Sequence, residues 1–231
     1  KCELKNMEFF LNVVNPKNLL GDFANNVYRI DSLLKTDTGK YIVKMENSGL
    51  SLDKEVIKLY LLENPEVFLQ CFEEGLNFLD FLNLKLKIYH NDIKPPNICF
   101  KNNKFLFIDF GLAKYPDIDY SGNIQELLNN YKDVFKIKNR GSNLYKSPFN
   151  FMRIKTFLHD EDVFSYFMTM VEILKPHRVN RYSLKLSELT KADINVQNKN
   201  DYLKIFLKNV LKENVEEKEY NMLDLNLKMV D

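Results

Sequence analysis

The segment NICFKNNKFLFIDFG, residues 97–111, restricts the possible folds of this chain more than any other. Two short apolar runs flank Asn102 and Asn103, and asparagine tolerates the positive φ angles that a tight hairpin turn requires. We therefore predict a β-hairpin here. Its second strand ends directly before Asp109, so the hairpin delivers this carboxylate to a defined position.

An earlier hairpin is predicted over residues 27–46. The polarity of these residues alternates, and the alternation breaks at the sequence TDTG, where Asp37, Thr38 and Gly39 supply turn chemistry between two strands. The following segment, 51–62, opens with a serine cap and carries apolar residues at helical spacing. We predict a short helix there.

Longer helices are predicted further along the chain. Residues 72–88 and 162–175 are apolar on most sides, as in helices that lie at the centre of a domain. Residues 112–148 are only weakly periodic, which predicts a long loop with one helical piece at 124–135. The segment 202–228 has the pattern of amphipathic helices.

Composition predicts a folded protein and excludes some partners. Apolar residues make up 45% of the 231 residues and charged residues 28%, which argues against disorder. The 33 basic and 32 acidic residues leave a net charge of +1, so no electrostatic footprint for nucleic acid or membrane is present. No apolar stretch approaches the roughly 20 residues that span a bilayer.

The cysteines indicate the compartment. Cys2, Cys71 and Cys99 are odd in number and far apart, without the paired spacing of a zinc site or a disulfide framework. We therefore expect a reducing compartment, either the cytoplasm or the nucleus.

The sequence HNDIKPPN, residues 90–97, gathers polar side chains directly before the predicted hairpin of residues 97–111. A merely polar loop is one interpretation of such a cluster. That interpretation is hard to reconcile with Asp109, which the hairpin returns to the neighbourhood. A single DFG tripeptide would carry little information, but several motifs in one order carry more.

The order of these motifs resembles that of eukaryotic-type protein kinases. The catalytic loop and DFG motif correspond to 90–97 and 109–111, YIVK at 41–44 resembles the third-strand motif, and GSNLYKSPF at 141–149 resembles the end of the activation loop. DVFSYF, from residue 162, resembles the start of the buried helix of the large lobe.

The resemblance implies an α+β, two-lobed protein-kinase-like fold, with a small β-rich N-lobe and a larger, mainly helical C-lobe. We expect the N-lobe, shortened, over residues 1–72 and the C-lobe over 73–231, with a short hinge near residues 69–75. Only 35 positions separate Glu55 from His90, fewer than the family normally uses, so the small lobe or its hinge must be trimmed.

The resemblance also implies roles for individual residues, with ATP and Mg²⁺ as cofactors. Asp92 would accept the proton of the substrate hydroxyl, Lys94 would neutralise the γ-phosphate, and Asn97 and Asp109 would hold Mg²⁺. The catalytic set is therefore Asp92, Lys94, Asn97 and Asp109, and the metal set is Asn97 and Asp109.

The nucleotide site implied by the resemblance comprises Lys44, Glu55, Gly21 and Val27. Lys44 would hold the α- and β-phosphates, and Glu55 would fix this lysine through an ion pair. In the phosphate loop GDFANNVY, Gly21 is kept, but Phe23 and Asn26 stand where further glycines are usual.

Supporting roles are implied for three more residues. Ser142 would tie Asp92 and Lys94 to the peptide-binding segment, Asp162 would accept backbone amides of the catalytic loop, and His90 would pack beneath Phe110.

Other positions depart from the family pattern. Asn91 replaces the usual arginine, which removes the charge that would pair with a phosphorylated activation loop. Phe149 and Lys218 replace both members of a buried ion pair, which costs less than the loss of one.

Three functions are consistent with this pattern. The leading prediction is an ATP-dependent serine/threonine protein kinase with a protein substrate, since every polar residue given a chemical role is present. A pseudokinase that binds and regulates a protein partner is the alternative, favoured by the altered glycine loop. A kinase-like small-molecule phosphotransferase is a third, against which Lys94 and the segment GSNLYKSP argue.

Overall fold

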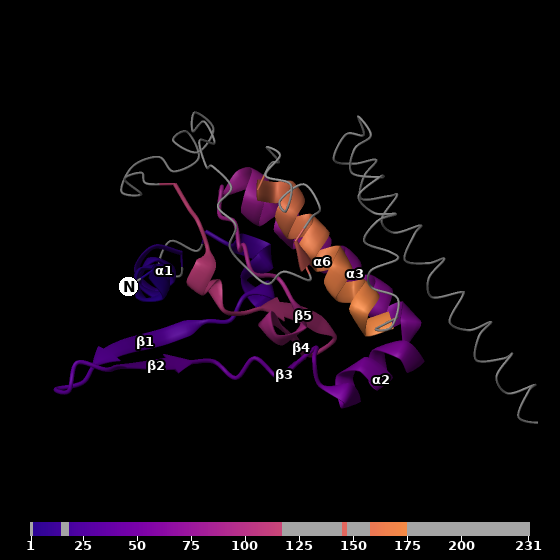
Figure 1. The fold of residues 1–231 in the computed structure, drawn as a ribbon, viewed down its shortest axis with the longest axis horizontal. Helices are drawn as coiled ribbons and strands as arrows, with labels where there is room; N and C mark the ends of the chain where they lie inside the picture. The colour runs from indigo at the N-terminus through magenta and orange to yellow at the C-terminus, as the bar shows by residue number, and fades with distance from the viewer. Residues whose placement is uncertain (1, 15–18, 117–144, 147–157, 175–231) are drawn as a thin grey trace, which may run out of the picture.

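The computed structural model describes residues 2–14, 19–116, 145–146 and 158–174 of the chain, and these form an α+β structure (Figure 1). The helices are α1 (Cys2–Phe9), α2 (Glu55–Glu63), α3 (Pro65–Asp80) and α6 (Leu158–Leu174), and the strands are β1 (Ile30–Lys35), β2 (Tyr41–Met45), β3 (Leu50–Ser51), β4 (Ile98–Lys101) and β5 (Lys104–Phe107). Single helical turns extend α1 over Phe10–Val14 and α3 over Phe81–Lys85. No helix in these described stretches is long and apolar enough to cross a bilayer.

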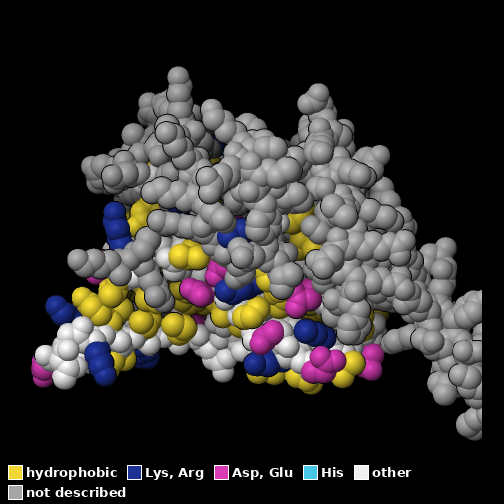
Figure 2. Space-filling view, in the orientation of Figure 1, with side chains coloured by type: hydrophobic (Ala, Val, Ile, Leu, Met, Phe, Trp, Pro, Cys, Tyr) yellow, Lys and Arg dark blue, Asp and Glu magenta, His cyan; other side chains and the backbone are white. Residues whose placement is uncertain are grey.

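The earlier predicted hairpin is confirmed as the two-stranded sheet β1-β2. The strands are antiparallel, and Leu34 lies opposite Ile42. The turn depends on Gly39, whose φ of 78° lies in the region that favours glycine, and the Gly39 amide donates to the Thr36 carbonyl at 2.9 Å. Hydrophobic side chains show on the surface of this hairpin, with Leu34 60% and Ile42 56% exposed (Figure 2).

The hairpin over residues 97–111 is also confirmed. β4 and β5 pair antiparallel within a three-stranded sheet of order β3-β4-β5. The turn residues Asn102 and Asn103 have φ angles of 52° and 55°, as the hairpin requires. The turn is held against α3, because the Cys71 thiol donates to the Asn103 carbonyl at 3.0 Å.

Helices α3 and α6 pack side by side and form the main part of the core (Figure 1). The rings of Phe72 and Tyr166 stack with centroids 5.5 Å apart, and the Tyr166 hydroxyl lies 3.2 Å from the Phe72 carbonyl. Gly75 allows this approach, since a Cβ there would overlap the Tyr166 hydroxyl. The predicted central helix is therefore confirmed, with a start at Leu158 rather than residue 162.

Helix boundaries differ from the predicted ones for identifiable reasons. α2 starts at Glu55 because Ser51 pairs with Cys99 as a strand residue, so it does not cap the helix. α3 starts at Pro65 rather than residue 72, and proline is favoured in a first helical turn.

No hinge lies at residues 69–75, because this interval lies within the continuous helix α3. The chain passes from β2 into β3 through residues 46–49 instead. The Lys101 ammonium fixes this connection against β4, since it lies 2.9 Å from Glu46 Oε1 and 2.7 Å from the Asn47 carbonyl.

Several predicted features lie outside the described residues. They are most of the loop 112–148 with its helical piece 124–135, the helices of 202–228, and Ser142, Phe149 and Lys218.

Candidate functional site

The polar segment 90–97 forms a loop between the turn that ends α3 and strand β4. Its last residues, Pro95–Asn97, form a single 3₁₀ turn that leads directly into Ile98, the first residue of β4. At the other end of the loop, Tyr89 and Lys114 exchange two backbone hydrogen bonds of 2.8 Å each. The loop is therefore held beside the segment that follows Asp109.

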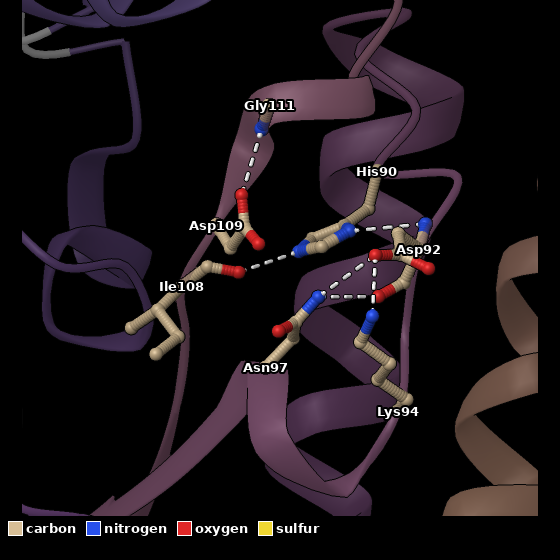
Figure 3. A network of polar contacts seen from close by, with 7 residues as sticks. All are labelled: His90, Asp92, Lys94, Asn97, Ile108, Asp109 and Gly111. Carbon is tan, nitrogen blue, oxygen red and sulfur yellow. Dashed lines mark hydrogen bonds and ion pairs between the residues drawn. The ribbon is translucent and has the colours of Figure 1, made fainter. Parts of the chain in front are cut away.

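The side chains of Lys94 and Asn97 both contact the carboxylate of Asp92 (Figure 3). The Lys94 ammonium lies 2.8 Å from Asp92 Oδ2, and Asn97 Nδ2 donates to the same oxygen at 3.2 Å and to the Asp92 carbonyl at 2.9 Å. The Asp92 side chain is 9% exposed and that of Lys94 25%. The structure thus brings together three of the four residues predicted for catalysis.

Asp109, the fourth, lies just beyond the end of β5. Its backbone is left-handed, with φ of 60° and ψ of 63°, and its Oδ1 accepts a 3.3 Å hydrogen bond from the Gly111 amide. This local bond helps aspartate to adopt a conformation that most residues avoid. The side chain remains exposed, so the carboxylate is accessible to a ligand.

Asn97 and Asp109 fit a magnesium ion by the chemistry of their free atoms. The Ile108 amide donates to the Asn97 carbonyl at 2.9 Å, so the hairpin sets Asn97 beside the residue that precedes Asp109. Both hydrogen bonds of the Asn97 amide leave from Nδ2, which turns Oδ1 away from Asp92 (Figure 3). An amide oxygen and a carboxylate are ligands that Mg²⁺ accepts together with substrate phosphates.

The described parts of the chain contain no group of three or more His, Cys, Asp or Glu side chains that could hold a metal ion. A site there would therefore need oxygens from a substrate as well as from the protein.

Asp162 supports the loop from α6. Its Oδ2 accepts the His90 amide at 2.8 Å and its Oδ1 accepts the Asn91 amide at 2.9 Å, as predicted. Burial raises the pKa of Asp162 above its ordinary value, while nearby His90 and the two amide bonds act in the opposite direction. The Asp162 carboxylate thus supplies hydrogen-bond acceptors for two loop amides, which take part in no strand or helix.

His90 connects the loop to Ile108, which lies between the end of β5 and Asp109. Its Nε2 lies 2.9 Å from the Ile108 carbonyl, which can only accept, and its Nδ1 lies 3.3 Å from the Asp92 amide, which can only donate. A proton on Nε2 and a lone pair on Nδ1 would satisfy both contacts. Its centroid lies 4.5 Å from that of Phe110, so the predicted packing is confirmed.

The residues predicted for nucleotide binding lie on several different elements of the fold. Lys44 on β2 and Glu55 at the start of α2 are both exposed, and no side-chain hydrogen bond or ion pair joins them in the part of the chain that the structure describes. Gly21, with φ of 50°, opens a 3₁₀ turn over Gly21–Asn26. Val27 is buried and bridges to Phe107, two residues before Asp109.

Two residues near the site were given no role from sequence. Lys146 is buried, and burial lowers its pKa while the carboxylates of Asp92 and Glu161 act to raise it. Asn6 of α1 contacts the turn after Asp109. The sequence could have indicated Asn6, since Asn6, Phe9 and Phe10 have the spacing of one helical face, which places a polar residue beside two aromatic ones.

The fold and the loop geometry are compatible with a kinase-like protein, and comparisons with known proteins point the same way. No family model matches the chain. It is 29% identical over 115 residues to a probable serine/threonine-protein kinase of Dictyostelium discoideum, which covers 49% of this chain and 12% of the relative. It is 32% identical over 111 residues to mitogen-activated protein kinase kinase kinase 8 of Rattus norvegicus, which covers 48% of this chain and 18% of the relative.

The matched part thus spans less than a fifth of each relative's own length. These partial similarities support a kinase-like relationship for about half of the chain.

Proposed function

We propose that this protein is an ATP-dependent serine/threonine protein kinase. The observation that carries the proposal is the Asp92 carboxylate, held between Lys94 and Asn97 and close in the fold to the hairpin that ends at Asp109. A phosphoryl group in transfer carries negative charge on several oxygens, so placement and charge neutralisation are the main requirements of its catalysis. The similarity to two proteins with kinase names supports the same function.

The four residues of the catalytic set each have a task in this reaction. The substrate hydroxyl oxygen attacks the γ-phosphorus, the bond to the leaving ADP oxygen breaks, and Asp92 takes the hydroxyl proton. Lys94, now paired with Asp92, would contact the γ-phosphate. Asn97 and Asp109 would hold Mg²⁺, which when bound supplies positive charge against the phosphate oxygens.

Other parts of the proposal stay predictions. We retain the division into an N-lobe, residues 1–72, and a C-lobe, residues 73–231, although α3 crosses the boundary between them. A protein substrate, a regulatory protein partner and a location in the cytoplasm or nucleus belong to the same proposal.

A pseudokinase is the second candidate, and one observation favours it. The segment that follows Gly21 is a 3₁₀ turn with buried Asn26, whose Nδ2 donates to the Phe105 carbonyl at 3.3 Å. The Phe23 amide donates to the Leu20 carbonyl at 2.9 Å, so this amide is used within the segment itself. A closed 3₁₀ turn of this kind, tied to β5 by Asn26, differs from the open glycine-rich loop that presents free amides to phosphate.

A transfer assay on a panel of proteins separates the candidates. Wild type is compared with Asp92→Ala and Asp109→Asn, and with Asp31→Asn as a control, since Asp31 is a β1 carboxylate paired with Arg29 at 3.2 Å. Labelled phosphate transfer by wild type and Asp31→Asn, lost in the other two variants, supports the kinase. Thermal stabilisation by Mg²⁺ and ATP without transfer supports the pseudokinase, and equal transfer by all four proteins contradicts the site.

A further inference from the structure

Helix α1 contacts the turn that follows Asp109 through one buried amide. The Asn6 side chain is 3% exposed, and its Nδ2 lies 2.8 Å from the carbonyl oxygen of Phe110, 3.0 Å from that of Gly111 and 3.1 Å from that of Ala113. An amide nitrogen has two hydrogens, so the three acceptors share them. These contacts join positions more than 100 residues apart in the sequence.

The turn in question has little intrinsic stability. It is a single 3₁₀ turn, Phe110–Leu112, that starts from the left-handed Asp109 and closes with an Ala113 amide bond to the Phe110 carbonyl at 3.0 Å. Short 3₁₀ turns have poor hydrogen-bond geometry, and the carbonyls at their ends lack partners within the turn. Asn6 supplies those partners from a different helix.

Aromatic contacts at the end of α1 set the distance between this helix and the turn that Asn6 binds. The ring centroids of Phe10 and Phe110 are 4.5 Å apart. Phe9 and Tyr115 stack with centroids 3.7 Å apart and planes 3° from parallel. Phe110 opens the turn and Tyr115 follows it, so the end of α1 contacts both ends of the segment whose carbonyls Asn6 binds.

We propose that Asn6 is a positioning residue, which holds the turn after Asp109 so that the Asp109 carboxylate is presented for metal binding beside Asn97. The role rests on the proposed function, because it concerns how a metal ligand is oriented. Asn6 itself touches no reacting atom. Hydrophobic contact alone fixes how closely α1 approaches, whereas hydrogen bonds to the carbonyls of Phe110, Gly111 and Ala113 also fix the rotation of the turn.

The variant Asn6→Asp tests this role, because it keeps the shape of the side chain and replaces the donor by oxygens that face three carbonyl oxygens. Asn26→Asp is the matched control, since Asn26 is 4% exposed and also donates an amide hydrogen to a core carbonyl, that of Phe105. If Asn6→Asp does not fold, Asn6→Ser takes its place, as a hydroxyl can donate to only one of the three carbonyls.

The first measurement needs neither metal nor nucleotide. We expect hydrogen exchange of the peptide covering 108–116 to be about tenfold faster in Asn6→Asp than in wild type, through local opening of the turn. Asn26→Asp leaves exchange of this peptide unchanged. No increase in Asn6→Asp, or an equal increase in both variants, overturns the proposal.

The second measurement is the Mg²⁺ concentration that gives half-maximal nucleotide binding by wild-type protein and by Asn6→Asp. Asn6→Asp raises this concentration, while the affinity for nucleotide without Mg²⁺ stays that of wild type. An unchanged Mg²⁺ requirement overturns the role of Asn6. Wild-type protein that binds no nucleotide at any Mg²⁺ concentration overturns the proposed function, and the role of Asn6 in metal binding with it, whatever the exchange data show.

Discussion

Lys94 Nζ lies 2.8 Å from Asp92 Oδ2, so the proposed proton acceptor and the proposed phosphate-binding cation form an ion pair before any substrate is present. Neither charge is fully exposed. An ion pair of this kind positions both side chains in advance. In the proposed reaction, the substrate hydroxyl would then bind to Asp92 and the γ-phosphate to Lys94. By contrast, Lys44 and Glu55 are both exposed, and no hydrogen bond or ion pair joins their side chains within the described part of the chain.

The first prediction compares these two lysines. We expect Lys94→Ala to lower kcat by about 10² because a cation beside the transferred group is lost, and Lys44→Ala to have a much smaller effect. Initial rates of phosphate transfer at saturating ATP measure both. A loss of nucleotide affinity in Lys44→Ala, with Lys94→Ala unaffected, would instead identify Lys44 as the phosphate-binding lysine.

The second prediction concerns the buried carboxylate under the loop. Asp162→Ala leaves the amides of His90 and Asn91 buried without acceptors, which should lower the free energy of unfolding by about 2–4 kcal/mol. Urea denaturation measures the change. Asp31→Ala is the control, because its partly exposed pair with Arg29 should contribute less than about 1 kcal/mol. Equal losses in the two variants would show that the amides find other partners.

The third prediction concerns the contact between α3 and α6. Helix propensity alone would make Gly75→Ala stabilising by about 1 kcal/mol. Overlap with the Tyr166 ring should reverse the sign and give a net loss of about 1–3 kcal/mol. Combined with Tyr166→Phe the loss should shrink, but not vanish, because the ring carbon Cζ would still lie 2.8 Å from the added Cβ. Thermal unfolding of the four proteins of this double-mutant cycle provides the test, and additive losses would contradict it.

The fourth prediction concerns alkaline pH. Burial raises the pKa of Cys71 to about 12. Between an unfolded thiol pKa of about 8.5 and this value, the native state binds more protons than the unfolded state, so the free energy of unfolding falls as pH rises.

Cys71→Ala removes this contribution, so its stability should decline less steeply than that of wild type from pH 9 upward. Urea denaturation at several pH values gives both slopes. Parallel slopes would show that the thiol titrates alike in both states.

Structure could be predicted from the sequence where the deciding residues are close together along the chain. The Asn102–Asn103 turn and the TDTG turn carry their own conformational preference, and both hairpins formed where predicted. The contacts of Asp92 with Lys94 and Asn97 also lie within one short loop.

Prediction failed where the deciding partner is distant in sequence. A hinge was expected near Gly75, yet this glycine serves a close approach to Tyr166, 91 positions later. The value of Asn6 likewise depends on carbonyls beyond Asp109. The pairing of Lys44 with Glu55 was inferred from the order of the motifs and stays a prediction, since the structure shows both side chains exposed.

The two backbone hydrogen bonds between Tyr89 and Lys114 join the two ends of one continuous segment. This segment contains the loop 90–97, the hairpin β4-β5 and the turn after Asp109. Inserting or deleting one residue in either strand of that segment would shift the pairing by one and turn alternate side chains to the opposite face. The arrangement of Asn97 and Asp109 that the proposed magnesium site needs would then be lost. The strand register between these two residues is thus as strict a requirement of the proposed site as their identity, and a homologue with a shifted register would lack the site even with both residues kept.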